Sequence, residues 1–315
     1  MKYHRNRRDR RTFLKELATC GSAAFLAAGG VAFAADWKTR IGLELYTVRD
    51  LMAKDYAGTL AKVAEIGYKE IEPASDYAGM EPKQYRAMLD RLGLSMPSTH
   101  VGATEGPGLE KQLEGFQIMG IRYTEVRGAG GPGGGGRGRG PGAPGAPAEE
   151  AIKRQAAQLN KHGEIVKKFG MKMLIHNHTG EFALLEGSDT RRPYDILLAE
   201  TDPSLVAMQL DIGWASVAGQ NISEMFRKNP GRFELWHVKD AQGIREMSPQ
   251  MPQSQRQRTA KLVPVGEGEV DYKPIFAQAE LAGLKHFCIE QDSAIEGDSL
   301  AAARTSFINL KKILG

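Results

Sequence analysis

The chain has few cysteines for its 315 residues, and this limits how it can be stabilised. It contains only Cys20 and Cys288. Cys20 lies in an N-terminal segment that we expect to be removed, so Cys288 remains alone and an internal disulfide is excluded. Because Cys288 lies in an apolar run, we expect a buried core thiol there.

A net charge of one sign is also missing once the N-terminal segment is set aside. Residues 1–34 hold seven of the 42 lysines and arginines and two of the 38 acidic residues, which leaves 35 basic and 36 acidic residues in the rest of the chain. The basic isoelectric point therefore belongs largely to this segment. It is no argument for a nucleic-acid partner, and we expect none.

Residues 1–34 have the pattern of an export signal. A basic region that contains Arg10 and Arg11 precedes an apolar stretch over residues 17–34, which ends in small residues. The arginine pair resembles the twin-arginine type of signal, which carries folded proteins across the bacterial inner membrane. An uncut membrane anchor is the alternative, but the apolar run is short and interrupted by glycine. We therefore expect export by the twin-arginine machinery, a periplasmic or secreted protein, and no stable membrane insertion after cleavage.

A glycine-rich phosphate loop is missing after the first expected strand. Residues 46–50 follow that strand and have no glycine, which argues against a doubly wound nucleotide-binding sheet. Instead, short apolar runs alternate with amphipathic segments that end in glycine, as in parallel βα units. Strands are expected at residues 41–46, 68–72, 94–100, 121–126, 171–176, 205–211, 232–238 and 285–290. Helices are expected at residues 56–66, 82–92, 109–119, 149–169, 193–200, 221–228, 272–282 and 299–313.

Eight such units predict an α/β protein with a single (β/α)₈ TIM barrel over residues 35–315. Two segments interrupt the alternation. Residues 128–147 form a Gly/Pro-rich stretch that cannot bury a core and is interpreted as a flexible loop. Residues 247–261 form a polar insertion after the seventh strand, where it would overhang the catalytic face as a lid or substrate wall.

Side chains that bind metals or protons gather at the carboxyl ends of these strands, where TIM barrels have their active sites. They are His100, Glu125, His176, His178, Glu181, Asp211, His237, Lys239 and Glu290. Several carboxylates converging on a dry barrel centre require a compensating cation. Carboxylates with an imidazole suit Mn²⁺, Co²⁺, Mg²⁺, Fe²⁺ or Zn²⁺, so we expect one divalent metal ion as cofactor.

Four motifs together resemble the sugar phosphate isomerase/epimerase family of the xylose-isomerase-like barrels. They are His-Asn-His-Thr-Gly-Glu-Phe at 176–182, Leu-Asp-Ile-Gly-Trp at 210–214, His-Val-Lys-Asp at 237–240 and Val-Gly-Glu-Gly-Glu-Val-Asp-Tyr at 265–272. The resemblance implies a metal held by Glu181, Asp211, His237 and Glu290. Many relatives end the fifth strand in Glu-Asn where this chain has His176-Asn177, so His176 and His178 stay open as alternatives to Glu181.

The resemblance also implies the chemistry. Such enzymes remove a proton next to a carbonyl through a metal-stabilised enediolate. Glu181, Glu290, His100 and His178 are the candidates for moving that proton. His176, Lys239 and Trp214 are the candidates for binding substrate, although a Lys239–Asp240 salt bridge and a core position for Trp214 are simpler alternatives.

The substrate is expected to be a small carbohydrate. Nothing in the sequence resembles a phosphate cradle, and exported enzymes rarely meet sugar phosphates, so we predict an isomerase or epimerase of an unphosphorylated sugar or keto-sugar. A lyase or dehydratase, for example one that eliminates the aglycone of a 3-keto-glycoside, would use the same site. A non-catalytic sugar-binding barrel and the superfamily's nuclease branch are further alternatives, and the sequence does not specify an oligomeric state.

Overall fold

The computed structural model describes residues 37–128, 149–188, 190–293 and 298–315. The expected export signal and the Gly/Pro-rich stretch, apart from Gly128, lie outside the described residues. Among the described helices, none is both long and apolar enough to cross a membrane.

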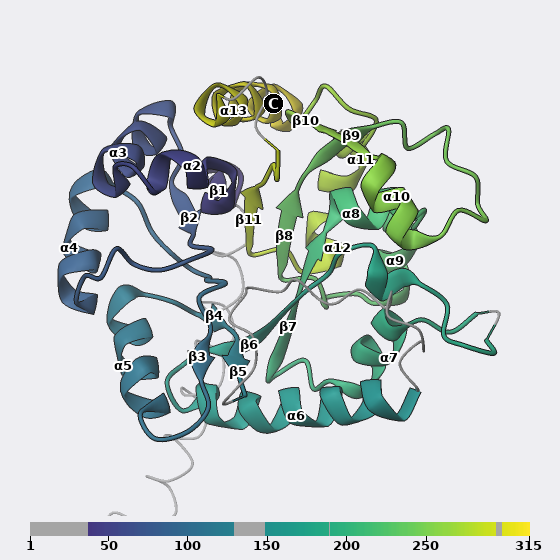
Figure 1. Ribbon diagram of the computed structural model, residues 1–315, viewed down its shortest axis with the longest axis horizontal. Coiled ribbons are helices and arrows are strands. Elements are labelled where there is room, and N and C mark those ends of the chain that lie inside the picture. The colour runs from purple at the N-terminus through teal and green to yellow at the C-terminus, as the bar shows by residue number, and fades with distance from the viewer. Residues whose placement is uncertain (1–36, 129–148, 189, 294–297) are drawn as a thin grey trace, which may run out of the picture. The chain divides into compact units, whose positions relative to one another are not determined.

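The centre of the described fold is a curled parallel sheet of seven strands, with the order β2-β1-β11-β8-β7-β6-β4. These strands are β1 (Gly42–Glu44), β2 (Glu70–Glu72), β4 (Tyr123–Thr124), β6 (Lys172–His176), β7 (Val206–Asp211), β8 (Leu235–Val238) and β11 (His286–Ile289). Parallel pairing places all their carboxyl ends at one edge of the sheet (Figure 1). The α/β TIM barrel predicted from the sequence is confirmed.

The expected third strand at residues 94–100 is not a regular strand. Ser95 pairs with Glu70 of β2 through one isolated parallel bridge, and Ser98 pairs with Tyr123 of β4 through another. Between them stands Pro97, which has no N–H for a ladder hydrogen bond. This irregular stretch therefore links the two edge strands of the seven-stranded sheet. A separate two-stranded pair joins β3 (Ala103–Thr104) to β5 (Val126–Arg127).

Helices surround the strands, as Figure 1 shows. The longer ones are α3 (Tyr56–Ile66), α4 (Pro82–Leu92), α5 (Leu109–Met119), α6 (Glu149–Lys167), α7 (Pro193–Glu200), α9 (Ile222–Lys228) and α13 (Ser299–Leu314). They match the expected helices closely. The segment expected as one helix over residues 272–282 divides into α11 (Tyr272–Phe276) and α12 (Ala279–Ala282). The remaining short elements include α2 (Arg49–Met52), α8 (Ile212–Val217) and the 3₁₀ turns η1 (Trp37–Thr39), η2 (Leu45–Val48) and η3 (Gly180–Phe182).

Local sequence explains where these helices begin and end. The Asp55 side chain accepts a hydrogen bond of 2.9 Å from the Gly58 N–H and so caps the first turn of α3. Gly93 ends α4 with a φ of 66°, a left-handed conformation that glycine adopts without steric cost. The helices then bury their apolar faces against the sheet in one large core. Cys288 is a buried free thiol, as expected.

Candidate active site

The carboxyl ends of four neighbouring strands bring together four possible metal ligands. They are His176 at the end of β6, Asp211 at the end of β7, His237 in β8 and Glu290 directly after β11. One ligand atom from each side chain lies within 4.8 Å of those of the others. The four side chains are at most 8% exposed. We call these four residues the ligand cluster.

Two features of the sequence place Asp211 in the ligand cluster. Its Oδ1 accepts a hydrogen bond of 2.7 Å from the Trp214 N–H and caps α8, which fixes the carboxylate at the end of β7. Gly213 lets α8 approach Lys239 closely, because a Cβ at this position would lie 2.4 Å from the Lys239 carbonyl oxygen. The Asp-Ile-Gly-Trp motif is thus a structural requirement for holding β7, α8 and β8 together at the site.

His237 lies between two carboxylates. Its Nδ1 donates to Glu290 Oε2 at 2.7 Å, and its Nε2 donates to Glu72 Oε1 at 2.6 Å. Burial lowers the pKa of His237, but the two carboxylates outweigh it and raise the pKa to about 10. This pKa favours the protonated imidazole while no metal is bound, and His237 would have to release the proton of one nitrogen to serve as a metal ligand.

Lys239 supplies a second positive charge to the ligand cluster. Its Nζ lies 3.1 Å from Asp211 Oδ2, 3.0 Å from Glu290 Oε2 and 2.8 Å from Asp292 Oδ2. Burial lowers the pKa of Lys239, but the neighbouring carboxylates outweigh it and hold the pKa well above its usual value. The ammonium also lies 4.9 Å from the centre of the Trp214 ring, within the range of a cation–π contact.

The simpler expectation of a Lys239–Asp240 salt bridge is wrong, because Asp240 has other partners. The Asp240 carboxylate accepts hydrogen bonds from the backbone N–H groups of Gly266, Gly268 and Val270 at 2.9–3.1 Å. A Cβ on Gly268 would lie 2.0 Å from Asp240 Oδ1, which explains the second glycine of this motif. Asp240 therefore fixes the loop before α11, while Lys239 remains with the ligand cluster.

The donor set fits a divalent cation. Asp211 Oδ2 has the Lys239 ammonium as an ion-pair partner, but His176 Nδ1 is buried without a hydrogen-bond partner among the described residues, which is costly unless another group satisfies it. Burial and the neighbouring His237 lower the pKa of His176 well below its usual value, so its imidazole is in the neutral form that binds metals. Two imidazoles and two carboxylates within this distance suit Zn²⁺, Mn²⁺, Fe²⁺ or Co²⁺.

The ligand cluster contains His176 in the place that the sequence analysis assigned to Glu181. The Glu181 carboxylate accepts a hydrogen bond of 2.8 Å from the backbone N–H of His178. Burial raises the pKa of Glu181. The 3₁₀ turn η3 tightens the chain here, so the Glu181 carboxylate is used to close that turn. Of the alternatives left open for the first ligand, the described geometry favours His176.

His100 belongs to an adjoining network rather than to the ligand cluster itself. Its Nδ1 faces Glu125 Oε1 at 3.1 Å, and its Nε2 faces Gln209 Oε1 at 2.9 Å and Glu72 Oε1 at 3.0 Å. Glu72 Oε2 in turn accepts from Gln209 Nε2 at 2.7 Å. The ring centre of His100 lies 5.5 Å from that of His237.

Four residues near the ligand cluster were not singled out from the sequence: Glu44, Glu72, Gln209 and Asp292. Glu44 and Glu72 end β1 and β2. Both strands were expected, so the rule that found the other strand-end ligands would also have found these two carboxylates. Gln209 lies inside β7 and Asp292 follows β11 by three residues, and neither carries a sequence signal of that kind.

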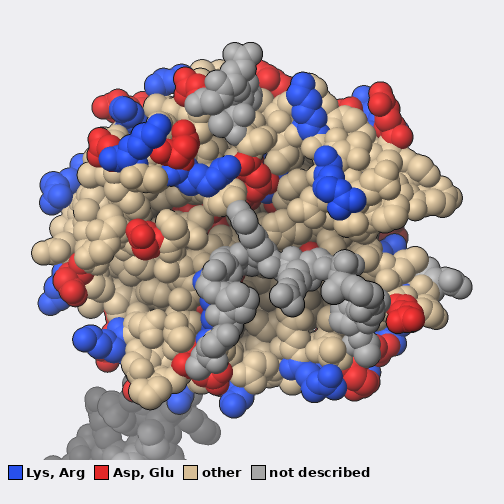
Figure 2. All heavy atoms as spheres, in the orientation of Figure 1, with Lys and Arg blue, Asp and Glu red and all other residues tan. Residues whose placement is uncertain are grey.

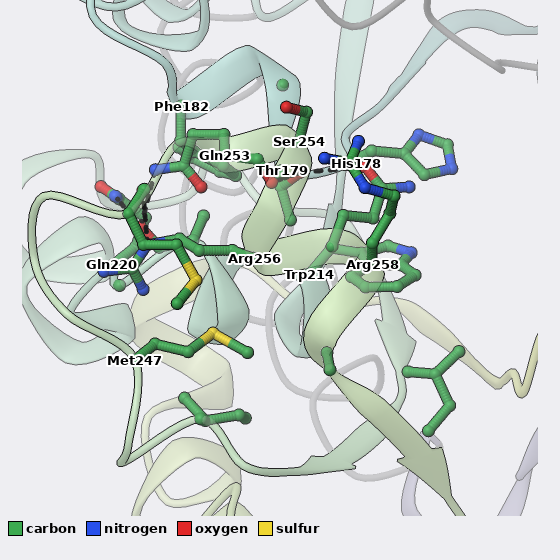
Figure 3. A pocket seen from close by; sticks show the side chains of 18 of the residues that line it. His178, Thr179, Phe182, Trp214, Gln220, Met247, Gln253, Ser254, Arg256 and Arg258 are labelled. Atoms are coloured by element: carbon green, nitrogen blue, oxygen red, sulfur yellow. Dashed lines mark hydrogen bonds between the residues drawn. The ribbon is translucent and has the colours of Figure 1, made fainter.

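A pocket of about 1900 Å³ adjoins the ligand cluster. Among its lining residues, three also contact the ligand cluster or its lysine. The His178 ring centre lies 5.0 Å from that of His176, and Trp214 and Asp292 contact Lys239 as described above. Burial, and then the charge of Lys239, lowers the pKa of His178 to about 4, so its imidazole is neutral. Figure 3 shows His178 and Trp214 at one end of this pocket.

The polar insertion forms much of the remaining wall of the pocket. It contains α10 (Gln253–Thr259) and leads into β10 (Lys261–Val263), which pairs with β9 (Asp240–Gln242). The buried Arg256 guanidinium donates to the carbonyl oxygens of Val217 at 2.9 Å and Ser248 at 2.6 Å. The bond to Val217 fastens the insertion to the end of α8. The insertion therefore lines this pocket (Figure 3), and its role as a substrate wall stays a prediction.

Comparison with known proteins agrees with this geometry. Residues 60–311 match the model of the family described as xylose isomerase-like TIM barrel. The chain belongs to this family. It is similar to a curated protein named inosose dehydratase from Geobacillus thermodenitrificans, with 30% identity over 145 residues, which are 44% of this chain and 46% of that protein. The chain thus spans about half the length of the curated relatives it matches.

Two solved structures of this xylose isomerase-like barrel family show the same fold. One is described as a sugar phosphate isomerase/epimerase from Parabacteroides distasonis, with a TM-score of 0.65, 22% identity and coverage of 88% of this chain and 95% of that one. The other is a xylose isomerase-like TIM barrel protein from Mycobacterium smegmatis in complex with magnesium. It has a TM-score of 0.57, 16% identity and coverage of 90% and 98%.

Proposed function

We propose that this xylose isomerase-like barrel is a metal-dependent enzyme that removes a proton next to the carbonyl of an unphosphorylated keto-sugar and then eliminates a neighbouring oxygen substituent. The observation that carries the proposal is the ligand cluster of His176, Asp211, His237 and Glu290, with the Lys239 ammonium beside it and a pocket at its edge. These four side chains would hold the metal. When bound there, a divalent ion supplies a Lewis acid that makes the hydrogen next to a carbonyl more acidic.

His178 is the side chain best placed to take the proton. It lines the pocket, adjoins the ligand cluster through His176, and carries a neutral imidazole. A neutral imidazole can accept a proton, but its lowered pKa makes it a weak base, so the hydrogen next to the carbonyl would have to be made acidic by the bound metal. Glu290, another of the four candidates expected from the sequence, does not line the pocket and is occupied by His237 and Lys239.

Asp292 and Lys239 are placed to assist the departing oxygen. Asp292 lines the pocket, and its carboxyl is 2.8 Å from Lys239 Nζ. Burial raises the pKa of Asp292 to about 6, so that a fraction of it carries a proton near neutral pH. The carbon–hydrogen electron pair becomes the new carbon–carbon double bond, the carbon–oxygen bond breaks with its electron pair on oxygen, and Asp292 protonates that oxygen while the Lys239 ammonium stabilises its charge.

Elimination is favoured over the epimerisation that the sequence analysis ranked first. An epimerase of the expected kind would use Glu181 and Glu290 as a pair of carboxylates. Glu181 lies neither in the ligand cluster nor among the lining residues of the pocket, and its carboxylate is held by the His178 N–H. Curated relatives named inosose dehydratase support the same choice.

The place of action is part of the proposal. The twin-arginine-type pattern of residues 1–34 supports export, and a compartment outside the cytoplasm favours an unphosphorylated substrate such as a 3-keto-glucoside. Replacing Arg10 and Arg11 by lysine in a fusion to a reporter is expected to abolish export. Normal export of this variant would contradict the twin-arginine route.

The chemistry is tested by incubating the Mn²⁺-loaded protein with methyl 3-keto-β-glucoside in D₂O. Wild type is expected to release methanol. Glu181→Gln should retain the activity, His178→Gln should lose both methanol release and deuterium uptake at carbon 2, and Asp292→Asn should keep deuterium uptake but release methanol slowly. Deuterium uptake without methanol release by wild type would indicate an epimerase or isomerase. Metal and sugar binding with neither reaction would indicate the non-catalytic barrel.

A further inference from the structure

The pocket is larger than a keto-sugar at the ligand cluster requires. Its volume is about 1900 Å³, whereas pockets for drug-sized ligands usually measure about 300–1,000 Å³. We propose that the part of the pocket beyond Trp214 is a subsite for a neutral, aromatic aglycone attached to the sugar. This inference rests on the proposed elimination and names the class of substrate, a keto-glycoside with a bulky apolar leaving group.

The wall of this subsite has a distinct apolar part. The lining side chains that give it this character are Phe182, Leu184, Ile244, Met247, Met251 and Leu262. Ile244, Met251 and Leu262 pack against a small hydrophobic cluster that contains Trp214 and Met247 and is separate from the barrel core. Leu184 is 48% exposed, so its side chain is accessible to a ligand in the pocket. Unbranched methionines adapt to flat ring systems.

The polar side chains of the subsite favour a neutral ligand. They are dominated by five glutamines, at positions 220, 242, 250, 253 and 257. The charged lining residues carry both signs, and Arg256 is already bonded to backbone carbonyl oxygens. Amide groups can donate to and accept from the hydroxyl groups of a phenolic ring without requiring a charge on the ligand.

The subsite is held in shape by bonds that do not involve the ligand cluster. Gln253 Nε2 donates to the Ala218 carbonyl oxygen at 3.1 Å, and Thr179 Oγ1 donates to the Gln253 carbonyl oxygen at 3.1 Å. Together with Arg256, these bonds fix α10 against α8 and against the loop after β6. A wall fixed in advance binds a rigid ring with little ordering cost.

The order of residues along the pocket matches the order of groups in a glycoside. His178, Trp214 and Asp292 lie next to the ligand cluster, while Met247 and Gln220 lie at the opposite end in Figure 3. A sugar at the ligand cluster would direct its anomeric oxygen toward Asp292 and its aglycone toward the insertion.

The test compares benzyl and methyl 3-keto-β-glucosides, because benzyl alcohol and methanol are leaving groups of nearly equal acidity. With the Mn²⁺-loaded full chain, kcat/KM is expected to be about tenfold or more higher for the benzyl substrate. The double variant Leu184→Glu, Met251→Glu should reduce this ratio to near one. Ile308→Glu is the matched control, since Ile308 is 45% exposed on α13 and does not line the pocket, and it should keep the ratio.

A second measurement separates this inference from the proposed chemistry. Naphthylmethyl β-glucoside has no ketone and cannot be eliminated, so its binding reports on the subsite alone. Wild type should bind it about tenfold more tightly than the double variant, even if no keto-glucoside reacts. Equal binding to both proteins, or equal kcat/KM for the benzyl and methyl substrates, would overturn the aglycone subsite.

Discussion

The Nε2 atom of His237 donates a hydrogen bond of 2.6 Å to Glu72 Oε1, from the side of the imidazole that faces away from Glu290. Glu72 is fully buried at the end of β2 and is itself held by Gln209. Histidines that bind metals through one nitrogen commonly donate from the other to a carboxylate, which orients the ring. The Glu72–His237 pair has this arrangement before any metal is considered.

Glu72→Gln should therefore weaken metal binding by about 10–100-fold, because the isosteric amide orients His237 less strongly and does not increase its basicity. Isothermal titration with Mn²⁺ or Zn²⁺ measures the change. Glu125→Gln is the control, since Glu125 contacts His100 and Arg127 rather than His237, and it should change the affinity only slightly. Equal affinities of wild type and Glu72→Gln would show that Glu72 only fills space.

The identity of the first metal ligand can be decided by two substitutions. His176→Gln should weaken metal binding by more than about 100-fold, since it removes a ligand of the cluster rather than a supporting group. The purified variant should therefore contain little metal. Glu181→Gln should retain the metal, because the Glu181 carboxylate is bonded to the backbone of His178. Elemental analysis after dialysis reads out both variants. The opposite pattern would restore the assignment made from the family resemblance.

Lys239 should stabilise the metal-free protein by compensating the negative charges of the buried carboxylates in the ligand cluster. In Lys239→Met, Asp211 and Glu290 lose the ammonium that lies about 3 Å from each, and unpaired buried charges commonly cost about 3–5 kcal/mol. A bound divalent ion would replace the missing positive charge. Saturating Mn²⁺ should therefore raise the Tm of Lys239→Met more than that of wild type.

The matched control for this experiment is Lys285→Met, which removes an equally long cation from Glu234 at a distance from the ligand cluster. Its metal-induced rise in Tm should equal that of wild type. If Lys239→Met also shows the wild-type rise, Lys239 does not compensate the carboxylates of the ligand cluster.

Glu234 predicts a pH dependence of stability away from the site. Burial raises the pKa of Glu234, but hydrogen bonds from Lys172 and Lys285 outweigh it, so the folded-state pKa lies below the ordinary 4.5. A lowered pKa stabilises the fold above pH 4.5, and this stabilisation disappears as the pH falls through the folded-state value. Glu234→Gln should thus reduce the unfolding free energy by about 1–2 kcal/mol near neutral pH, and by progressively less below pH 4.5.

Urea unfolding of wild type and Glu234→Gln across this range measures the difference. Glu150→Gln, at an exposed position of α6, controls for the general effect of removing a carboxylate. A difference between wild type and Glu234→Gln that stays constant into strongly acidic solution would mean that Glu234 acts by its shape rather than by its charge.

Hydrophobic periodicity and the glycines at helix ends predicted the order of helices and strands, because each βα unit is decided mainly by local residues. The helices over 56–66, 82–92 and 109–119 match within a residue, each ending at a glycine. A regular third strand was predicted over residues 94–100, but this stretch is irregular because Pro97 removes a ladder donor. Whether a neighbouring strand tolerates that gap depends on tertiary pairing. Charges on the described part of the face in Figure 2 are of both signs, as the composition indicated.

The sequence by itself determined the barrel and placed Asp211, His237 and Glu290 at strand ends, because the direction of parallel strands carries every such residue to the same edge. Only the tertiary structure decided that His176 joins them, that Lys239 bonds to Asp211, Glu290 and Asp292, and that Glu72 supports His237 from β2. These relationships join residues up to 165 positions apart. They depend on distances across the barrel, which spacing along the chain does not encode.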